Sequence, residues 1–169
     1  MPRIVSVFPE AHLVIAGNGP AKEGLERLCS SLGMNAHVSF VGWVSPDRTQ
    51  ELMNSSSIVI VPSRWREPFC LVALEAAQLA RPVVASRTGA LPEVVVHNST
   101  GLLFENENSG SLADSVIQLL ENPALAVDLG VKARQRSLTE FDWNNYVCSY
   151  EKLYERLSTE RIAAPIAVN

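Results

Sequence analysis

Two glutamates at a fixed spacing, Glu67 and Glu75, are the residues of this sequence best placed to do chemistry. Glu67 comes directly before a helix predicted over residues 68–79, and Glu75 lies inside that helix. At 1.5 Å of rise per helical residue, about 12 Å separates them along the axis. That distance is too long for two carboxylates that act as an acid and base pair on one bond. It suits the two ends of an elongated ligand whose hydroxyl groups donate hydrogen bonds to carboxylates.

The backbone between the two glutamates offers a place for an anion. N–H groups in the first turn of a helix have no partner inside the helix and attract negative charge. Here they belong to Phe69, Cys70, Leu71 and Val72. A diphosphate bound there would have a sugar toward Glu67 and a ribose toward Glu75. The alternative interpretation is that Glu67 only complements the helix dipole and that Glu75 is an exposed helical residue. The apolar neighbours of Glu75 favour a largely buried helix, in which a carboxylate needs a partner.

The elements that must position these residues follow from the apolar pattern. Short apolar runs predict strands at residues 12–16, 38–41, 57–61, 82–85 and 101–104. Leucines at helical spacing, Leu25, Leu28 and Leu32, predict a helix that Gly33 ends. Strands that are continuous apolar runs separated by helices predict an α/β protein, with a Rossmann-like parallel sheet and helices on both faces.

After residue 104 the pattern predicts helices only. The first has a predicted capping box at Ser111 and Asp114, and a second starts at Pro123. A last amphipathic stripe runs to Leu157, and we expect its aromatic side chains to lie in the core. These are Trp143, Tyr146, Tyr150 and Tyr154. The domain is predicted to span residues 1–157, with a loosely ordered tail over residues 158–169.

Ligands of parallel α/β sheets bind at the carboxyl ends of the strands, so the loops there are the candidate binding segments. The first loop, residues 17–22, begins like the dinucleotide fingerprint G-x-G-x-x-G, but Lys22 stands where the third glycine is needed. A dinucleotide site is therefore disfavoured. A tight turn, or a loop in which Gly17 and Gly19 border an anionic ligand, remain as interpretations.

The segment from Glu67 to Ala77 resembles the E-x7-E signature of retaining, nucleotide-sugar-dependent glycosyltransferases with the GT-B fold, the family 4 or group 1 class. Further segments resemble landmarks of that family in the same order. They are residues 12–20, 38–42, 61–63, 82–86, 89–93 and 100–103. The resemblance covers roughly residues 9–157. It implies the C-terminal, donor-binding half of a GT-B fold, lacking its first strand and the N-terminal domain that binds the acceptor.

The resemblance also implies roles for residues of this sequence. Glu67 would contact the donor sugar near the reacting carbon, and Glu75 would hold the ribose. The N–H groups at residues 69–72, with the glycine loop nearby, would face the diphosphate. The loop at Trp43 and Val44 would meet the base, mainly through its backbone. The reaction would move a sugar from a nucleoside-diphosphate sugar to an acceptor hydroxyl with retention, with no metal or other cofactor strictly required.

The sequence also departs from the family pattern. Cys70 and Ala80 stand where the family usually has glycine, so donor choice is open. The usual first strand carries an Arg and a Lys that clamp the diphosphate. Arg64, Arg66 and Arg87 are candidates to substitute for them, the alternative being that they are solvent-exposed surface residues.

We expect the isolated chain to transfer little or nothing, because the two domains of such enzymes close around the reactants. Two other functions remain as hypotheses. One is half of a sugar-nucleotide epimerase. The other is a non-catalytic nucleotide-binding module that forms a homodimer through the sheet edge left open by the truncation.

Composition bears on the partners, metal sites and cellular location that can be expected. Fourteen basic residues against eighteen acidic ones give a net charge of −4, which argues against nucleic acid as a partner. Three separated cysteines form no C-x-x-C pair, and His12, His37 and His97 have no metal-ligand spacing. We therefore expect no metal site. No apolar stretch reaches the roughly 18 residues of a membrane span, and no signal peptide is evident, so a cytoplasmic location is expected.

Overall fold

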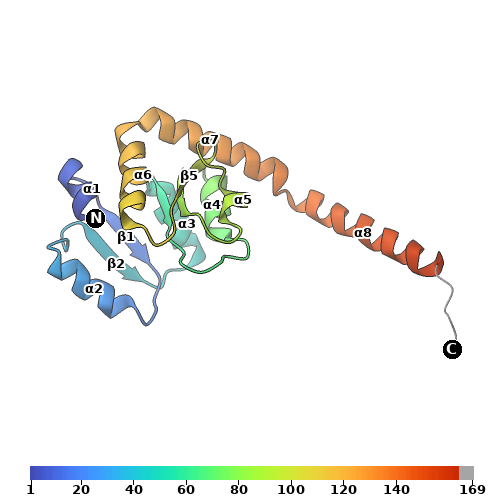
Figure 1. The fold of residues 1–169 in the computed structure, drawn as a ribbon, viewed down its shortest axis with the longest axis horizontal. Coiled ribbons are helices and arrows are strands. Elements are labelled where there is room, and N and C mark those ends of the chain that lie inside the picture. The colour runs from blue at the N-terminus through green and yellow to red at the C-terminus, as the bar shows by residue number, and fades with distance from the viewer. Residues whose placement is uncertain (164–169) are drawn as a thin grey trace.

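The computed structural model describes residues 1–163 as an α/β domain with one long helix that extends away from its body (Figure 1). The strands are β1 (Leu13–Ala16), β2 (Val38–Gly42), β3 (Val59–Val61), β4 (Val83–Ser86) and β5 (Gly101–Phe104). The first four helices are α1 (Pro2–Val7), α2 (Lys22–Ser31), α3 (Pro46–Ser55) and α4 (Leu71–Gln78). The others are α5 (Leu91–Val94), α6 (Ser109–Glu121), α7 (Pro123–Glu140) and α8 (Trp143–Ala163).

All five predicted strands are present, and every strand pair is parallel, as predicted. They form two sheets rather than one continuous sheet. The smaller has the order β1-β2, and the larger has the order β3-β4-β5. In the larger sheet Val83 pairs with Val59 on one side and with Gly101 on the other. Among the described residues no strand joins β1 to β3.

Helices cover both faces of the larger sheet, which confirms the predicted class. Successive side chains of a strand point to opposite faces. Val83 and Ala85 accordingly belong to a core shared with α4 and α5, whereas Val84 belongs to a second core shared with α6 and α7. All four residues of β4 and all four of β5 are buried. The larger sheet is therefore a firm platform for the loops at its carboxyl edge.

Two predicted helix starts were wrong by a few residues. The side chain of Asn108, not Ser111, caps α6, because its Oδ1 accepts the Ser111 N–H at 2.9 Å. The Ser111 hydroxyl instead accepts the N–H of Glu105. Helix α4 starts at Leu71 rather than at residue 68, because Cys70 has a left-handed backbone with φ of 77°. A left-handed residue cannot lie inside a right-handed helix.

The predicted burial of the last apolar stripe was also wrong. The leucines that predicted the helix ended by Gly33, which are Leu25 and Leu28 of α2 and Leu32 just after it, are exposed too. On α8, Trp143 is 71% exposed, and the tyrosines expected in the core are exposed as well. Their rings pack on one another along the helix, with centroids 4.7 to 6.2 Å apart, instead of against the sheet. Helical spacing predicts which side chains share a face, but not whether a partner covers that face.

Helix α8 continues to Ala163, so residues 158–163 of the predicted tail are helical. The rest of that predicted tail, residues 164–169, lies outside the described residues. In the described part of the chain, no helix combines the length and the apolar character that crossing a bilayer requires.

Candidate functional site

Glu67 is held by the loop that follows β3. The Ser63 hydroxyl donates to Glu67 Oε1 at 2.6 Å, and the Ser86 hydroxyl at the end of β4 donates to the Ser63 carbonyl at 2.6 Å. Ser86 is fully buried. The carboxylate therefore has one oxygen fixed by a hydrogen-bond chain that starts inside the sheet. Such a chain sets the direction of Glu67 without neutralising its charge.

The loop after β4 approaches the backbone of Glu67 closely. The Ala90 N–H donates to the Glu67 carbonyl at 2.8 Å. A Cβ on Gly89, whose φ is +54°, would lie only 2.3 Å from that same carbonyl oxygen. Real Cβ atoms do not come so near, so only glycine fits here. Gly89 thus allows the loops after β3 and β4 to meet at the carboxyl edge of the larger sheet.

The predicted anion site lies at the N-terminal end of α4. The first-turn N–H groups of Leu71 and Val72 have no preceding helical carbonyl to bond. Their side chains are exposed, so the end of the helix is open to a ligand. Burial raises the pKa of the Cys70 thiol above 9.0, and the carboxylates of Glu67 and Glu75 raise it further, against a lowering by the N–H groups of Ala73 and Val72. Cys70 is therefore a neutral thiol at pH 7.

Phe69 points toward the C-terminal part of α7 rather than standing free. Its ring meets Phe141 edge to face at 5.7 Å, and the Arg136 guanidinium lies 5.1 Å from the centre of the Phe141 ring. This contact ties the turn before α4 to the end of α7. Phe69 can contribute its backbone to an anion site while its side chain packs.

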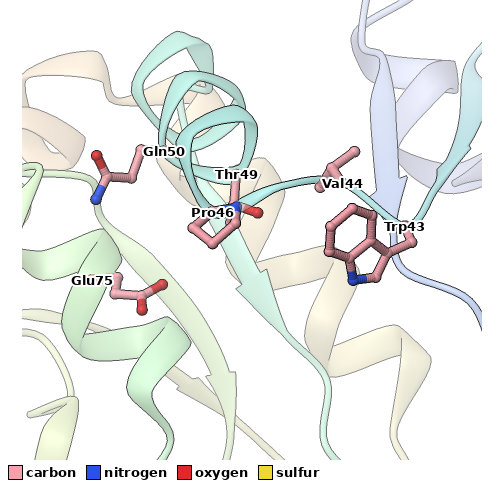
Figure 2. A pocket seen from close by; sticks show the side chains of 6 residues that line it. All are labelled: Trp43, Val44, Pro46, Thr49, Gln50 and Glu75. Atoms are coloured by element: carbon pink, nitrogen blue, oxygen red, sulfur yellow. The ribbon is translucent and has the colours of Figure 1, made fainter.

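Glu75 lies one helical turn further along α4 and faces a pocket of about 260 Å³. Figure 2 shows the six residues that line it, with the Glu75 carboxylate on one side and the Trp43 indole on the other. The pocket is lined by Trp43, Val44, Pro46, Thr49, Gln50 and Glu75. Glu75 is half-buried, and among residues 1–163 its carboxylate has no hydrogen-bond or ion-pair partner. A partner that would satisfy it must therefore come from solvent or from a ligand.

The loops after β1 and β2 support the outer wall of this pocket. The Gly17 N–H donates to the Gly42 carbonyl at 2.6 Å. With its amide turned so that the oxygen and nitrogen each meet a suitable partner, the Asn18 side chain bridges the same two loops. Its oxygen then accepts the backbone N–H of Trp43 and its nitrogen donates to the Gly17 carbonyl, each at 3.2 Å. Gly19 has open space around the position of a Cβ. Gly17 thus has a structural role beside Trp43, whereas nothing in the structure requires glycine at position 19.

The structure brings the predicted site residues to one edge in two groups. Glu67 and the start of α4 form one, and Glu75 with Trp43 and Val44 forms the other. Of the three arginines considered as substitutes for the phosphate clamp, Arg64 binds Glu107 at 2.6 Å. Arg66 and Arg87 are exposed.

Sequence reasoning missed residues that complete the site. Pro46, Thr49 and Gln50 line the pocket because α3 begins directly after the Trp43 loop, where Ser45 caps it. The S-P-D signal of a helix start at Ser45 could have placed them. The bond from Ser63 to Glu67 had a weaker signal, a serine four residues before a glutamate.

Comparison with known proteins identifies this arrangement. The strands, helices and loops are those of a GT-B glycosyltransferase domain. Sucrose-phosphate synthase from Thermosynechococcus elongatus superposes with a TM-score of 0.82 at 28% identity, over 94% of this chain and 41% of that one. The sequence profile of the family described as "Glycosyl transferases group 1" matches residues 1–136. The chain belongs to this family.

Relatives agree with this assignment. An uncharacterized glycosyltransferase of Methanocaldococcus jannaschii is 34% identical over 92% of this chain and 39% of its own length. The GDP-mannose-dependent alpha-(1-6)-phosphatidylinositol monomannoside mannosyltransferase of Mycobacterium tuberculosis is 33% identical over 85% of this chain and 39% of its own. The chain thus spans about two fifths of the length of these relatives.

Proposed function

We propose that this chain is the donor-binding domain of a glycosyltransferase that moves a sugar from a nucleoside-diphosphate sugar to an acceptor hydroxyl with retention at the anomeric carbon. The observation that carries the proposal is Glu75, a half-buried carboxylate without a described partner that faces a pocket bordered by an aromatic loop. A ribose offers two adjacent hydroxyl donors, and a carboxylate offers two acceptor oxygens, so the two groups match.

The rest of a nucleotide sugar fits the neighbouring groups. The base would lie beside Trp43 and Val44, and the diphosphate would meet the N–H groups at residues 69–72, where the helix dipole favours negative charge. Glu67 would face the donor sugar. Stabilisation of the leaving diphosphate lowers the barrier of such a transfer, and fixed N–H donors supply it without reorganising.

No metal is required in this proposal, because cationic side chains can balance the diphosphate. Arg64 forms an ion pair with Glu107, whereas Arg66 and Arg87 are exposed cations near this edge. The Mycobacterium tuberculosis relative is named for its dependence on GDP-mannose, which supports a nucleotide sugar as the donor. The base of the donor for this chain is left to the titration below.

The acceptor, in this proposal, binds to a separate N-terminal domain, and the reaction takes place in the cytoplasm. The isolated chain then transfers little or no sugar, because closure of two domains is needed to orient the reactants and exclude water. Robust transfer by the isolated chain would contradict this part of the proposal.

The proposal is tested by calorimetric titration of the chain with UDP, GDP and ADP. We expect one of them to bind, and Glu75→Gln to weaken its binding by about 10-fold or more, because a hydrogen bond to a charged group contributes roughly 1.5–3 kcal/mol. Glu121→Gln, a change of an exposed glutamate at the end of α6, is the matched control and should bind as the unaltered chain does. Equal binding by Glu75→Gln would refute the ribose assignment. Failure of all three nucleotides to bind would refute the donor-binding function.

A further inference from the structure

The loop of residues 63–67 is closed by one side-chain hydrogen bond. The Ser63 hydroxyl at its start donates to Oε1 of Glu67 at its end, over 2.6 Å. Among the side chains that the structure describes, Ser63 is the one hydrogen-bond or ion-pair partner of the Glu67 carboxylate. The three residues between them are exposed, so packing of side chains does not fix the loop. The orientation of the Glu67 carboxylate therefore depends on hydrogen bonding.

Both ends of this loop are tied to neighbouring elements through the backbone. At the start, the Ser63 carbonyl accepts the buried Ser86 hydroxyl of β4 at 2.6 Å. At the end, the Glu67 carbonyl accepts the Ala90 N–H at 2.8 Å. The backbone on either side of the hydrogen bond is thus fixed, and the torsions of the Glu67 side chain are the freedom that remains.

The bond from Ser63 removes this remaining freedom. A glutamate side chain samples several rotamers, and a ligand that has to order it loses affinity. A serine hydroxyl has a single hydrogen, which Ser63 donates to Oε1 and which leaves Oε2 able to accept a further hydrogen bond. The bond therefore selects both the rotamer of Glu67 and the oxygen that it offers to a ligand.

We propose that Ser63 is a positioning residue for the donor sugar, whose hydroxyl holds the Glu67 carboxylate so that Oε2 accepts a hydroxyl group of the sugar. This inference rests on the proposed function, in which Glu67 faces the sugar of a nucleotide-sugar donor. The base and the ribose are assigned to the separate group of Trp43, Val44 and Glu75. Loss of the Ser63 hydroxyl should therefore weaken recognition of the sugar and leave recognition of the nucleotide unchanged.

A merely structural role for Ser63 predicts a different result. Helix α4 starts only four residues after Glu67, at Leu71. If the hydroxyl did no more than close the loop, its removal would disturb the start of α4, and a nucleotide and its sugar derivative would lose affinity together. The ratio of the two dissociation constants therefore separates a positioning role from a structural one.

The experiment measures this ratio by calorimetric titration of the full chain with UDP and UDP-glucose, GDP and GDP-mannose, and ADP and ADP-glucose. For the pair that binds, we expect Ser63→Ala to shift the ratio against the sugar derivative by about 5-fold or more, because a mobile carboxylate keeps only part of its hydrogen bond to the sugar. Affinity for the nucleoside diphosphate should stay within about 2-fold, since the two groups are separate. Ser63→Thr keeps the hydroxyl and should keep the ratio. Ser31→Ala, which removes an exposed hydroxyl from α2, is the matched control and should change neither constant.

A double-variant cycle decides whether Ser63 acts through Glu67. Glu67→Ala should shift the ratio at least as far as Ser63→Ala does, and adding Ser63→Ala to Glu67→Ala should shift it no further. Should Ser63→Ala fail to fold, Ser63→Thr and Ser63→Val replace it, because they are alike in shape and differ by the hydroxyl.

An added effect of Ser63→Ala in the double variant, or an equal loss of nucleotide and sugar derivative, would overturn the proposal. A ratio that Glu67→Ala leaves unchanged would overturn it too, as would a nucleotide that binds while its sugar derivative does not, because no sugar would then meet Glu67. In these cases nucleotide binding that Glu75→Gln weakens would leave the donor-binding function standing. Failure of every nucleotide to bind would instead refute that function and this inference with it.

Discussion

Two residues at the ends of α4 hold backbone conformations that glycine adopts without strain. Cys70 before the helix has a φ of 77°, and Ala80 after it has a φ of 55°. At Ala80 the helix ends in a Schellman motif, since the Arg81 N–H donates to the Ala76 carbonyl and the Ala80 N–H to the Ala77 carbonyl, both at 2.9 Å. At both positions the positive φ favours glycine, but the residue has a side chain.

Ala80→Gly should therefore stabilise the domain. Removing the Cβ relieves the left-handed strain, which costs of order 1 kcal/mol, against the smaller entropic cost of glycine. We expect the free energy of unfolding in urea to rise by about 0.5–1 kcal/mol. Gln78→Gly is the control, because glycine at the last residue of α4, which has right-handed helical angles, should lower the free energy of unfolding by up to about 1 kcal/mol. A decrease in both variants would show that φ at position 80 carries no strain.

The Cys70 thiol gives a prediction in pH. Burial raises its pKa above 9.0, the ordinary value for a cysteine thiol. The folded state thus keeps a proton that the unfolded state loses, so this contribution to stability is present below pH 9 and is lost as the pH rises through the folded pKa. Iodoacetamide should accordingly alkylate Cys70 more slowly in the folded chain than in 6 M guanidinium between pH 8 and 10, as followed by peptide mass spectrometry. Equal rates with a midpoint at 9.0 in both states would contradict the raised pKa.

At the scale of the elements, two helical glycines should respond to alanine with opposite signs. A Cβ on Gly130 of α7 would lie 2.2 Å from the Ala80 carbonyl oxygen, whereas a Cβ on Gly24 of α2 has nothing within 4 Å. Gly130→Ala should lower the free energy of unfolding by about 1–3 kcal/mol through overpacking. Gly24→Ala should raise it by about 0.5–1 kcal/mol through helix propensity. Urea denaturation of both variants measures the difference, and stabilisation by both would mean that α7 does not pack closely on the end of α4.

The elements also show what the sequence can predict. The predicted ranges of β4 and β5 agree with the structure to within one residue, because short continuous apolar runs in an α/β protein are typical of buried parallel strands. The start of α4 was misplaced, because the left-handed Cys70 is not a residue type that signals this conformation. The division into two sheets was not predicted either, since strand order depends on which edges meet in space. For the site, the sequence shows the spacing of Glu67 and Glu75. It does not show that residues of α3 line a pocket with Glu75, because that depends on how the loop after β2 packs near α4.

At the scale of the whole molecule, the cores that stabilise the domain are formed without α8. Both cores of the domain are built from residues before Phe141, including Leu129 and Ala133, which are buried on α7. Side chains of α8 up to Thr159 are exposed or half-exposed, and its aromatic rings contact one another. Phe141 itself matters to the site, because it holds Phe69 before α4.

Ending the chain after Asp142 should therefore leave the unfolding midpoint of the domain within about 2 °C of its original value, because helical residues that bury no apolar surface add little to global stability. Far-UV circular dichroism should lose helical signal, while the near-UV transition stays cooperative. Leu129→Ala in the full chain is the contrasting variant, since emptying a fully buried leucine costs about 2–5 kcal/mol and should lower the midpoint by several degrees. If truncation after Asp142 unfolded the domain, the aromatic face of α8 would have to be part of the core in solution.

Ending the chain after Glu140 removes Phe141 as well. This truncation should weaken nucleotide binding in the calorimetric titration, because it removes the ring against which Phe69 packs. The chain that ends after Asp142 keeps Phe141 and should bind the nucleotide as the full chain does.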